Sequence, residues 1–233
     1  MKHNSFHSAC PTRKETRWGL GYLAFSLLLL PWLLKEGNAL LASPLSQARL
    51  NFVYYAINFL VVVFLCRKYL GETFRAGLRS PFASVWYALL GYLGSQALGE
   101  LLLYGITVIK PDFYNVNDLS VGSMLQGDYR LVAMGVVFLV PVAEETLYRG
   151  LIFRNLLGKN RWAAYLVSMA LFSAMHVVGY IGVYTPVHLL LCFLQYLPPA
   201  FCLCWCYHQT GTLAAPVIMH TICNAMAAYS SLT

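Results

Sequence analysis

The chain has 233 residues, of which 59% are hydrophobic and only 11% are charged. Soluble domains carry about 25% charged residues, so this composition excludes a soluble globular protein and predicts one with several membrane-spanning helices. Lys and Arg (16) outnumber Asp and Glu (9), giving a net charge of +7. An anionic inner leaflet accounts for this excess of positive charge, and no nucleic-acid partner is needed.

Seven apolar runs are candidates for transmembrane helices, because about 20 residues rising ~1.5 Å each cross the hydrocarbon core. They cover residues 18–34, 50–66, 84–109, 131–157, 162–180, 186–207 and 212–229. The sequence therefore predicts an all-α fold, a polytopic membrane helix bundle with about seven transmembrane helices. A basic leader and the small residues Ala39, Ala42 and Ser43 leave a signal peptide as the alternative for the first run, although that run is as long as a full span.

The positions of Lys and Arg predict the orientation, because cytoplasmic segments next to the membrane carry the excess of these residues. With the N-terminus inside, all but four of the 16 fall in inner segments, the exceptions being Lys35, Arg49, Lys110 and Arg130. We therefore expect an integral multi-pass protein, in a bacterial plasma membrane, with a cytoplasmic N-terminus.

The chain divides into two parts by where its polar residues lie. Residues 1–129 contain the N-terminal basic segment and three spans of little polar content, which we expect to act as a scaffold. Every candidate catalytic group lies in residues 130–233, which we expect to form a catalytic four-helix core. Between them, the outer segment 110–130 is rich in turn-forming residues and could be a lid or a connector.

Two adjacent glutamates lie in the fourth run, at a depth where an unpaired carboxylate costs several kcal/mol. Glu145 and Arg149 are four residues apart, so they share one helix face and can pair. Glu144 points about 100° away around the helix, without a local counter-ion. We expect Glu145 and Arg149 to support the site and Glu144 to act as a general base.

Polar side chains also interrupt the fifth and seventh runs. Phe172 lies four residues before His176, and His220 four residues before Asn224, so each pair shares a helix face. Counting ~1.5 Å per residue from the inner helix ends places Glu144, His176 and Asn224 at similar depths, with His220 about one turn nearer the inner side. We expect a shared polar pocket near the middle of the membrane, lined by protein and open to water.

Three motifs on successive runs carry a resemblance to a known family: Glu144-Glu145-xxx-Arg149, Phe172-xxx-His176 and His220-xxx-Asn224. In this order they resemble the signature of the CPBP intramembrane proteases, also called Abi, which include CAAX prenyl endopeptidases and bacteriocin-processing enzymes. The resemblance covers roughly residues 130–229, and the first three runs show none. It implies an intramembrane endopeptidase that hydrolyses a peptide bond of a membrane-anchored or amphipathic protein or peptide.

The resemblance also implies roles for the four polar residues. Glu144 and His176 would activate a water for attack on a peptide carbonyl, and His220 with Asn224 would bind the oxyanion that develops. The remaining residues of the three motifs would support them. These roles agree with the chemistry of peptide hydrolysis, which needs a base and donors aimed at the oxyanion.

A metal is the alternative for the mechanism, because Glu144, His176 and His220 could hold Zn²⁺ with a water in the fourth position. No His-Glu-x-x-His motif is present, and a mechanism without a metal is favoured.

Two other functions fit the composition. One is a non-catalytic bacteriocin-immunity or partner-binding membrane protein of the same family, against which the intact polar set argues. The other is a proton-coupled transporter, which could also use intramembrane Glu and His, but no inverted repeat or pair of broken helices is visible. Neither the substrate nor the side from which it approaches follows from these residues.

Overall fold

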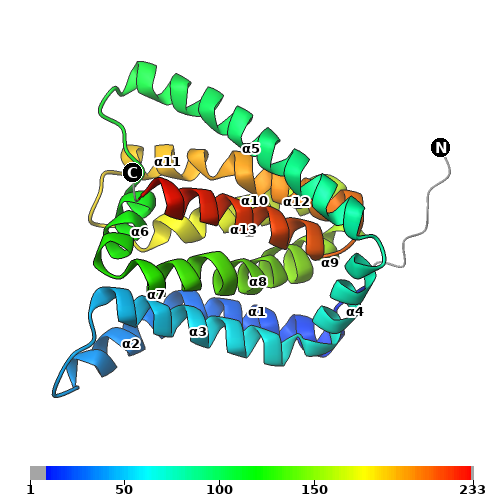
Figure 1. Cartoon of the computed structure of the whole chain (residues 1–233), viewed down its shortest axis with the longest axis horizontal. Helices are drawn as coiled ribbons and strands as arrows, with labels where there is room; N and C mark the ends of the chain where they lie inside the picture. The colour runs from blue at the N-terminus through cyan, green and yellow to red at the C-terminus, as the bar shows by residue number, and fades with distance from the viewer. Residues whose placement is uncertain (1–8, 232–233) are drawn as a thin grey trace.

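The computed structural model describes residues 9–231, and these residues form helices and no strand, which confirms the all-α prediction. Figure 1 shows the helices packed as an elongated bundle. Their bounds are α1 Arg13–Leu28, α2 Leu30–Ala39, α3 Gln47–Leu65, α4 Arg67–Leu78, α5 Pro81–Ile109, α6 Val116–Gly127, α7 Tyr129–Met134, η1 Gly135–Leu139, α8 Val140–Glu145, η2 Thr146–Phe153, α9 Arg154–Leu157, α10 Arg161–Val178, α11 Pro186–Gln195, α12 Leu197–Thr210 and α13 Ala214–Ser230.

Within the described residues, five helices are long and apolar enough to cross a membrane, and a sixth span is added if the bent pair α1–α2 counts as one. This is fewer than the seven spans expected. The difference lies in α13, which corresponds to the last apolar run but has only 17 residues, short of the ~20 that cross the hydrocarbon core.

The first apolar run, from which one span was expected, is bent. The axes of α1 and α2 differ by 47° at the break, where Pro31 lies in the first turn of α2. Proline has no backbone N–H and its ring clashes with the carbonyl four residues earlier, so an α-helix kinks at this point.

The fourth apolar run forms one continuous helix, Tyr129–Leu157, that contains two π-helical stretches. η1 precedes α8 and η2 follows it, so the turn that carries the two glutamates has wide turns on both sides. Pro141 cannot donate to the carbonyl four residues earlier, and the N–H of Val140 bonds to Gly135, five residues earlier. Such π-turns occur frequently at functional sites.

The bundle packs around this helix. α13 contacts η1 and α8 on one side, and α3 contacts the same helix on the other. α5 packs against α12 and α13 near Gly91, where a Cβ atom would lie 2.4 Å from Sγ of Cys206, and it diverges from them toward its C-terminal end (Figure 1). The polar turn of α8 is therefore enclosed by helices from both halves of the chain.

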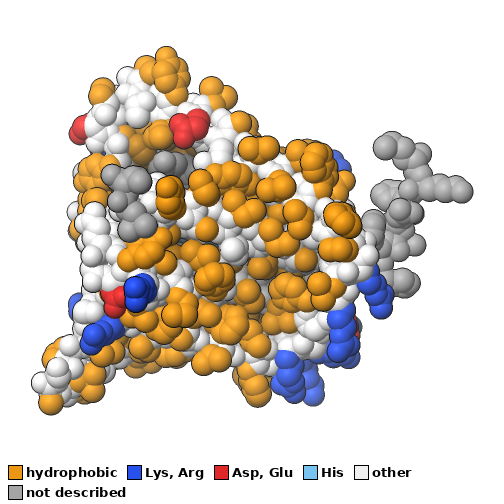
Figure 2. All heavy atoms as spheres, viewed as in Figure 1, with side chains coloured by type: hydrophobic (Ala, Val, Ile, Leu, Met, Phe, Trp, Pro, Cys, Tyr) orange, Lys and Arg blue, Asp and Glu red, His pale blue; other side chains and the backbone are white. Residues whose placement is uncertain are grey.

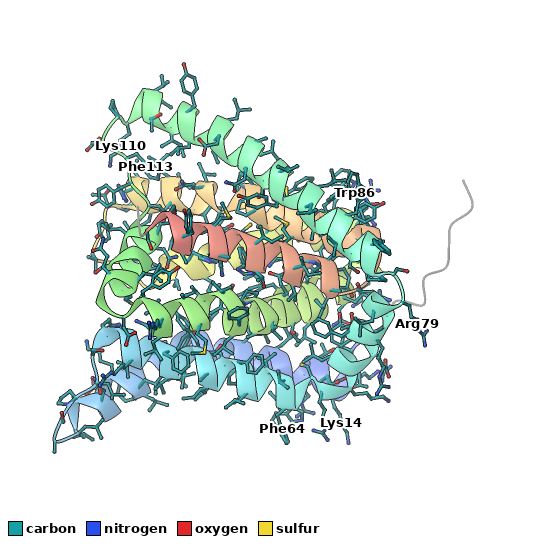
Figure 3. All side chains as sticks on the ribbon, viewed as in Figure 1. Lys14, Phe64, Arg79, Trp86, Lys110 and Phe113 are labelled. Atoms are coloured by element: carbon teal, nitrogen blue, oxygen red, sulfur yellow. The ribbon has the colours of Figure 1, made fainter. Side chains whose placement is uncertain are left out.

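The two ends of the bundle differ in charge. Lys14 and Arg79 lie at one end, with the start of α1 and with α4, while Lys110 and Phe113 lie at the other end, near α6 (Figure 3). Figure 2 shows most of the visible Lys and Arg side chains at the α4 end and a broad hydrophobic surface between the ends. We call these the basic end and the α6 end. Lys2, which was counted with the inner charges, lies outside the described residues.

Candidate active site

The predicted pair of Glu145 and Arg149 is present, and both side chains are fully buried. Nη1 of Arg149 donates to Oε1 of Glu145 over 3.0 Å, and Nη2 donates to the carbonyl of Ala200 over 3.2 Å. The guanidinium also lies 4.2 Å from the centroid of the Phe172 ring, a favourable cation–π position. Arg149 therefore lies in the bundle core, and counting it among the inner charges at the membrane surface was wrong.

His220 lies between the two glutamates. Its Nδ1 is 2.8 Å from Oε1 of Glu145, and because an ionised carboxylate only accepts, Nδ1 carries the proton of this bond. Its Nε2 faces Oε2 of Glu144 at 4.0 Å. The expected offset of one turn between His220 and Glu144 is thus wrong. π-Turns are wider and rise less per residue than an α-helix, so counting ~1.5 Å per residue through η2 overestimates the depth of Glu144.

Glu144 is the less constrained of the two carboxylates. Its side chain keeps 19% of its exposure, whereas that of Glu145 is fully buried. Oε2 of Glu144 is buried and has no hydrogen-bond partner within the described residues. Glu145 bonds to Arg149 and His220 through Oε1, and its Oε2 is likewise buried without a hydrogen-bond partner within the described residues. Of the two glutamates only Glu144 lines the cavity described below, so it is the carboxylate available to a substrate or a water.

His176 is held on α10 by its own helix and by an aromatic neighbour. Nδ1 lies 2.8 Å from the carbonyl of Phe172, and because a carbonyl only accepts, Nδ1 donates and Nε2 is left as the acceptor. The Phe172 ring lies 4.8 Å from the imidazole, as the spacing predicted. The imidazole is also stacked on the Tyr196 ring, with 4.0 Å between the ring centroids and 24° between the ring planes.

Asn224 lies nearer the α6 end than expected. Its Nδ2 donates to the carbonyl of Val136 over 2.7 Å, and Val136 comes two turns before Glu144 on the fourth helix. A count along α13 alone could not place this amide, because the level at which α13 crosses the fourth helix depends on their packing. The second N–H and the carbonyl oxygen of the Asn224 amide take no part in this bond.

One cavity of about 840 Å³ joins the four predicted residues, since Glu144, His176, His220 and Asn224 all line it. Most of the rest of its lining comes from α6 and from the ends of α2, α3, α10 and α13 that lie on the same side of the bundle. The cavity therefore runs from Glu144 toward the α6 end, away from the basic end (Figure 1). The shared polar pocket that the sequence predicted is present.

A comparison with known protein families matches residues 127–226 to the family described as type II CAAX prenyl endopeptidase Rce1-like. All three motifs lie inside the matched range. Residues 127–226 belong to this family. Comparisons with curated proteins and with solved structures found no match.

The Rce1-like region gives the chain its class. A type II CAAX prenyl endopeptidase is a protease, so the match of residues 127–226 supports, at the level of the family, a CAAX-protease-like intramembrane endopeptidase. The apolar helices agree, since the chain is an integral membrane protein that acts in contact with a bilayer.

Several residues around the Rce1-like region line the cavity but were not predicted. Tyr54 and Tyr55 of α3 do so, as do Asn117 and Asp118 of α6, and Tyr196 lies inside the matched range. No spacing or motif marks the two tyrosines of α3, which stand in an apolar run. Tyr196 precedes Pro198 and Pro199, a pair that marks the break between α11 and α12.

The residues proposed as zinc ligands do not form a ligand cluster in this arrangement. Nowhere in residues 9–231 are three or more His, Cys, Asp or Glu side chains placed to hold a metal ion. His220 uses Nδ1 for Glu145 and His176 uses Nδ1 for a carbonyl, so each ring keeps Nε2 free, an arrangement that histidine ligands of a metal also show. In the absence of a ligand cluster within residues 9–231, we derive no step through a metal.

Proposed function

We propose that this chain is an intramembrane endopeptidase that hydrolyses a peptide bond of a membrane-anchored or amphipathic protein or peptide, with Glu144, His176, His220 and Asn224 as its active site. One observation supports this most directly. Glu144, whose Oε2 has no hydrogen-bond partner within the described residues, shares one cavity with two imidazoles inside a region of a protease family.

In the first step Glu144 acts as the general base. A water held between its carboxylate and Nε2 of His176 gives a proton to Glu144 as its oxygen bonds to the peptide carbonyl carbon. Nε2 of His176 can accept a hydrogen bond from this water, because Nδ1 holds the ring proton. The cavity has room for both water and a peptide segment.

In the second step donors bind the oxyanion, and the C–N bond breaks. Nη1 of Arg149 and Nδ1 of His220 both donate to Oε1 of Glu145, and a His220 protonated on both nitrogens would donate its Nε2–H to the oxyanion together with the amide of Asn224. Glu144 then returns its proton to the leaving amine. Losing one such donor typically costs about 10² to 10³ in rate.

This mechanism uses no metal, and it is supported by the finding that no three His, Cys, Asp or Glu side chains in residues 9–231 are placed to hold one. Stoichiometric zinc in the purified protein, with activity lost on its removal and regained on its return, would contradict the mechanism without contradicting proteolysis.

The position of the cavity mouth suggests the side from which the substrate comes. The cavity extends to the α6 end, and most of the Lys and Arg side chains visible in Figure 2 lie at the opposite end. If the basic end faces the cytoplasm, as the positive-inside rule favours, a peptide enters from the extracytoplasmic side. The N-terminus is cytoplasmic in this orientation.

Cysteine labelling tests this orientation. In a Cys10→Ser background we expect Ser230→Cys, at an exposed position on the cavity rim, to react with a membrane-impermeant maleimide in intact cells. Leu78→Cys, at the basic end and 75% exposed, should react only after the cells are permeabilised. The reverse pattern would show that the cavity opens to the cytoplasm.

Peptide profiling tests the proposed function. We compare small membrane-associated peptides by mass spectrometry in cells that carry the wild type or Glu144→Ala. A precursor that accumulates only with Glu144→Ala, and whose product is absent, would give both the substrate and the cleaved bond. Identical peptide profiles, with the biological phenotype of the wild type retained by Glu144→Ala, would instead favour the non-catalytic immunity or partner-binding function.

A further inference from the structure

Tyr196 makes the closest ring contact of His176, yet it belongs to none of the three motifs. The two rings are stacked, with centroids 4.0 Å apart and planes 24° from parallel. Tyr196 stands at the junction between α11 and α12, where Pro198 and Pro199 begin the next helix. Because two prolines lack the N–H groups that would continue α11, the chain breaks here, and the break places the Tyr196 side chain at the wall of the cavity.

The hydroxyl of Tyr196 is held by the first turn of α6. It donates to Oδ1 of Asp118 over 2.5 Å and accepts from Nδ2 of Asn117 over 3.0 Å. The alternative acceptor, Oδ1 of Asn115, is farther away at 3.4 Å, so the single hydroxyl proton goes to Asp118. One donor and one acceptor bond fix the direction of the phenol ring.

The start of α6 is itself fixed against the same helix junction. Asn115 caps α6, since its Oδ1 accepts from the backbone N–H groups of Asn117 and Asp118. Its Nδ2 donates to Oε1 of Gln195 over 2.8 Å, the residue next to Tyr196. Asp118 therefore lies at a defined position and does not depend on Tyr196 alone to hold it there.

These contacts restrain the His176 ring in two complementary ways. The bond from Nδ1 to the Phe172 carbonyl fixes one ring nitrogen, and stacking on Tyr196 fixes the plane of the ring. With both in place, the ring has one orientation at the wall of the cavity that Glu144 also lines. Without the stacked ring, the imidazole can turn about the bond to the carbonyl and move Nε2 away from the water.

We propose that Tyr196 is a positioning residue for His176, and that Asp118 of α6 fixes Tyr196 in its stacked orientation. This inference rests on the proposed function, because it assigns His176 a reacting partner. It also assigns a task to a residue outside the Rce1-like range, since Asp118 lies before residue 127. Neither side chain is proposed to touch the reacting atoms.

Steady-state kinetics on the substrate identified by peptide profiling test the proposal. We expect Tyr196→Leu, which removes the stacked ring, to lower kcat about 10²-fold, the size of effect that follows a misplacement of about 1 Å. Tyr196→Phe keeps the ring and loses only its anchor, so a smaller loss of about tenfold is expected, with KM unchanged in both variants.

A double-mutant comparison tests whether Asp118 and Tyr196 act through one shared hydrogen bond or independently of each other. Asp118→Ala, which removes the acceptor, should cost the same as Tyr196→Phe, and the combined variant should be no slower than either single one, because each breaks the same link. Tyr184→Phe is the matched control. Tyr184 does not line the cavity, and its ring is stacked on His188, so its kcat should stay within about twofold of the wild type.

Three outcomes would overturn the proposal: wild-type kcat in Tyr196→Leu, losses that multiply in the double variant, or a rise in KM at constant kcat. The last would make Tyr196 a substrate contact.

A spectroscopic measurement tests the same inference without any activity. In ¹⁵N-histidine-labelled protein, with His176 assigned by its loss in His176→Gln, the wild type should show a single tautomer with the proton on Nδ1. Tyr196→Phe and Asp118→Ala should keep this tautomer, because the Nδ1 bond to the Phe172 carbonyl remains, but should broaden or shift the Nε2 signal as the ring gains motion, and Tyr184→Phe should not. If the wild type proves not to be a peptidase but these spectra change as expected, the proposed function fails and the positioning stands. Unchanged spectra in both variants would overturn the positioning itself.

Discussion

Glu144→Gln is expected to lower kcat by about 10² to 10⁴-fold, the usual contribution of a positioned general base. The amide has almost the shape of the carboxylate but cannot take the proton of the water. Because Oε2 of Glu144 has no hydrogen-bond partner within the described residues, the change breaks no such bond of that atom, and the thermal unfolding midpoint in detergent should stay close to that of the wild type. Loss of activity with stability retained is the result that identifies a catalytic carboxylate.

Glu100→Gln is the matched control for this variant. Glu100 also lies in an apolar helix, but it is exposed on α5 and does not line the cavity, so its kcat should stay within about twofold of the wild type. Full activity of Glu144→Gln would contradict the assignment of the base. A comparable loss in Glu100→Gln would show that removing any intramembrane carboxylate disturbs the enzyme.

Arg149→Met is expected to destabilise the protein by about 3–5 kcal/mol, the cost of removing one partner from a buried ion pair. Methionine fills part of the space of the arginine, but Glu145 is then left as a fully buried charge without its cation. The contact with the Phe172 ring is lost as well. The measurement is unfolding in detergent or in bicelles, followed by the loss of helical signal.

The double variant Glu145→Gln/Arg149→Met separates stability from chemistry. With both charges removed no buried charge is left unpaired, so most of the lost stability should return. Activity should not return, because His220 has lost the carboxylate that stabilises its charged form. Arg130→Met, at an exposed position, is the control and should unfold like the wild type. A destabilised double variant, or an active one, would contradict this account of the pair.

Interactions within one helix followed directly from the sequence. The pairing of Glu145 with Arg149 and the contact between Phe172 and His176 depend on a separation of four residues. The α-helical repeat makes such residues neighbours whatever surrounds the helix. The apolar runs similarly predicted the spans, apart from the bend at Pro31 and the short α13. The three motifs also led to the family to which residues 127–226 belong.

Interactions between helices did not follow in the same way. His220 was expected one turn from Glu144, but it lies next to both glutamates, and Asn224 contacts Val136 instead of lying level with Glu144. A depth count assumes a constant rise and equal starting levels. The π-turns that flank α8 violate the first assumption. The second fails because the helices begin at different levels in the bundle.

By itself, the sequence determined that this is a helical membrane protein and which turns carry the polar residues, because hydrophobicity and helical spacing act locally along the chain. Only the tertiary structure decided that Glu145 is shared by Arg149 and His220, that Tyr196 and the start of α6 close around His176, and that the cavity opens away from the basic end. These features depend on where separate helices cross, break and start relative to one another. That relative placement is set by the packing of the whole bundle, which no single stretch of residues encodes.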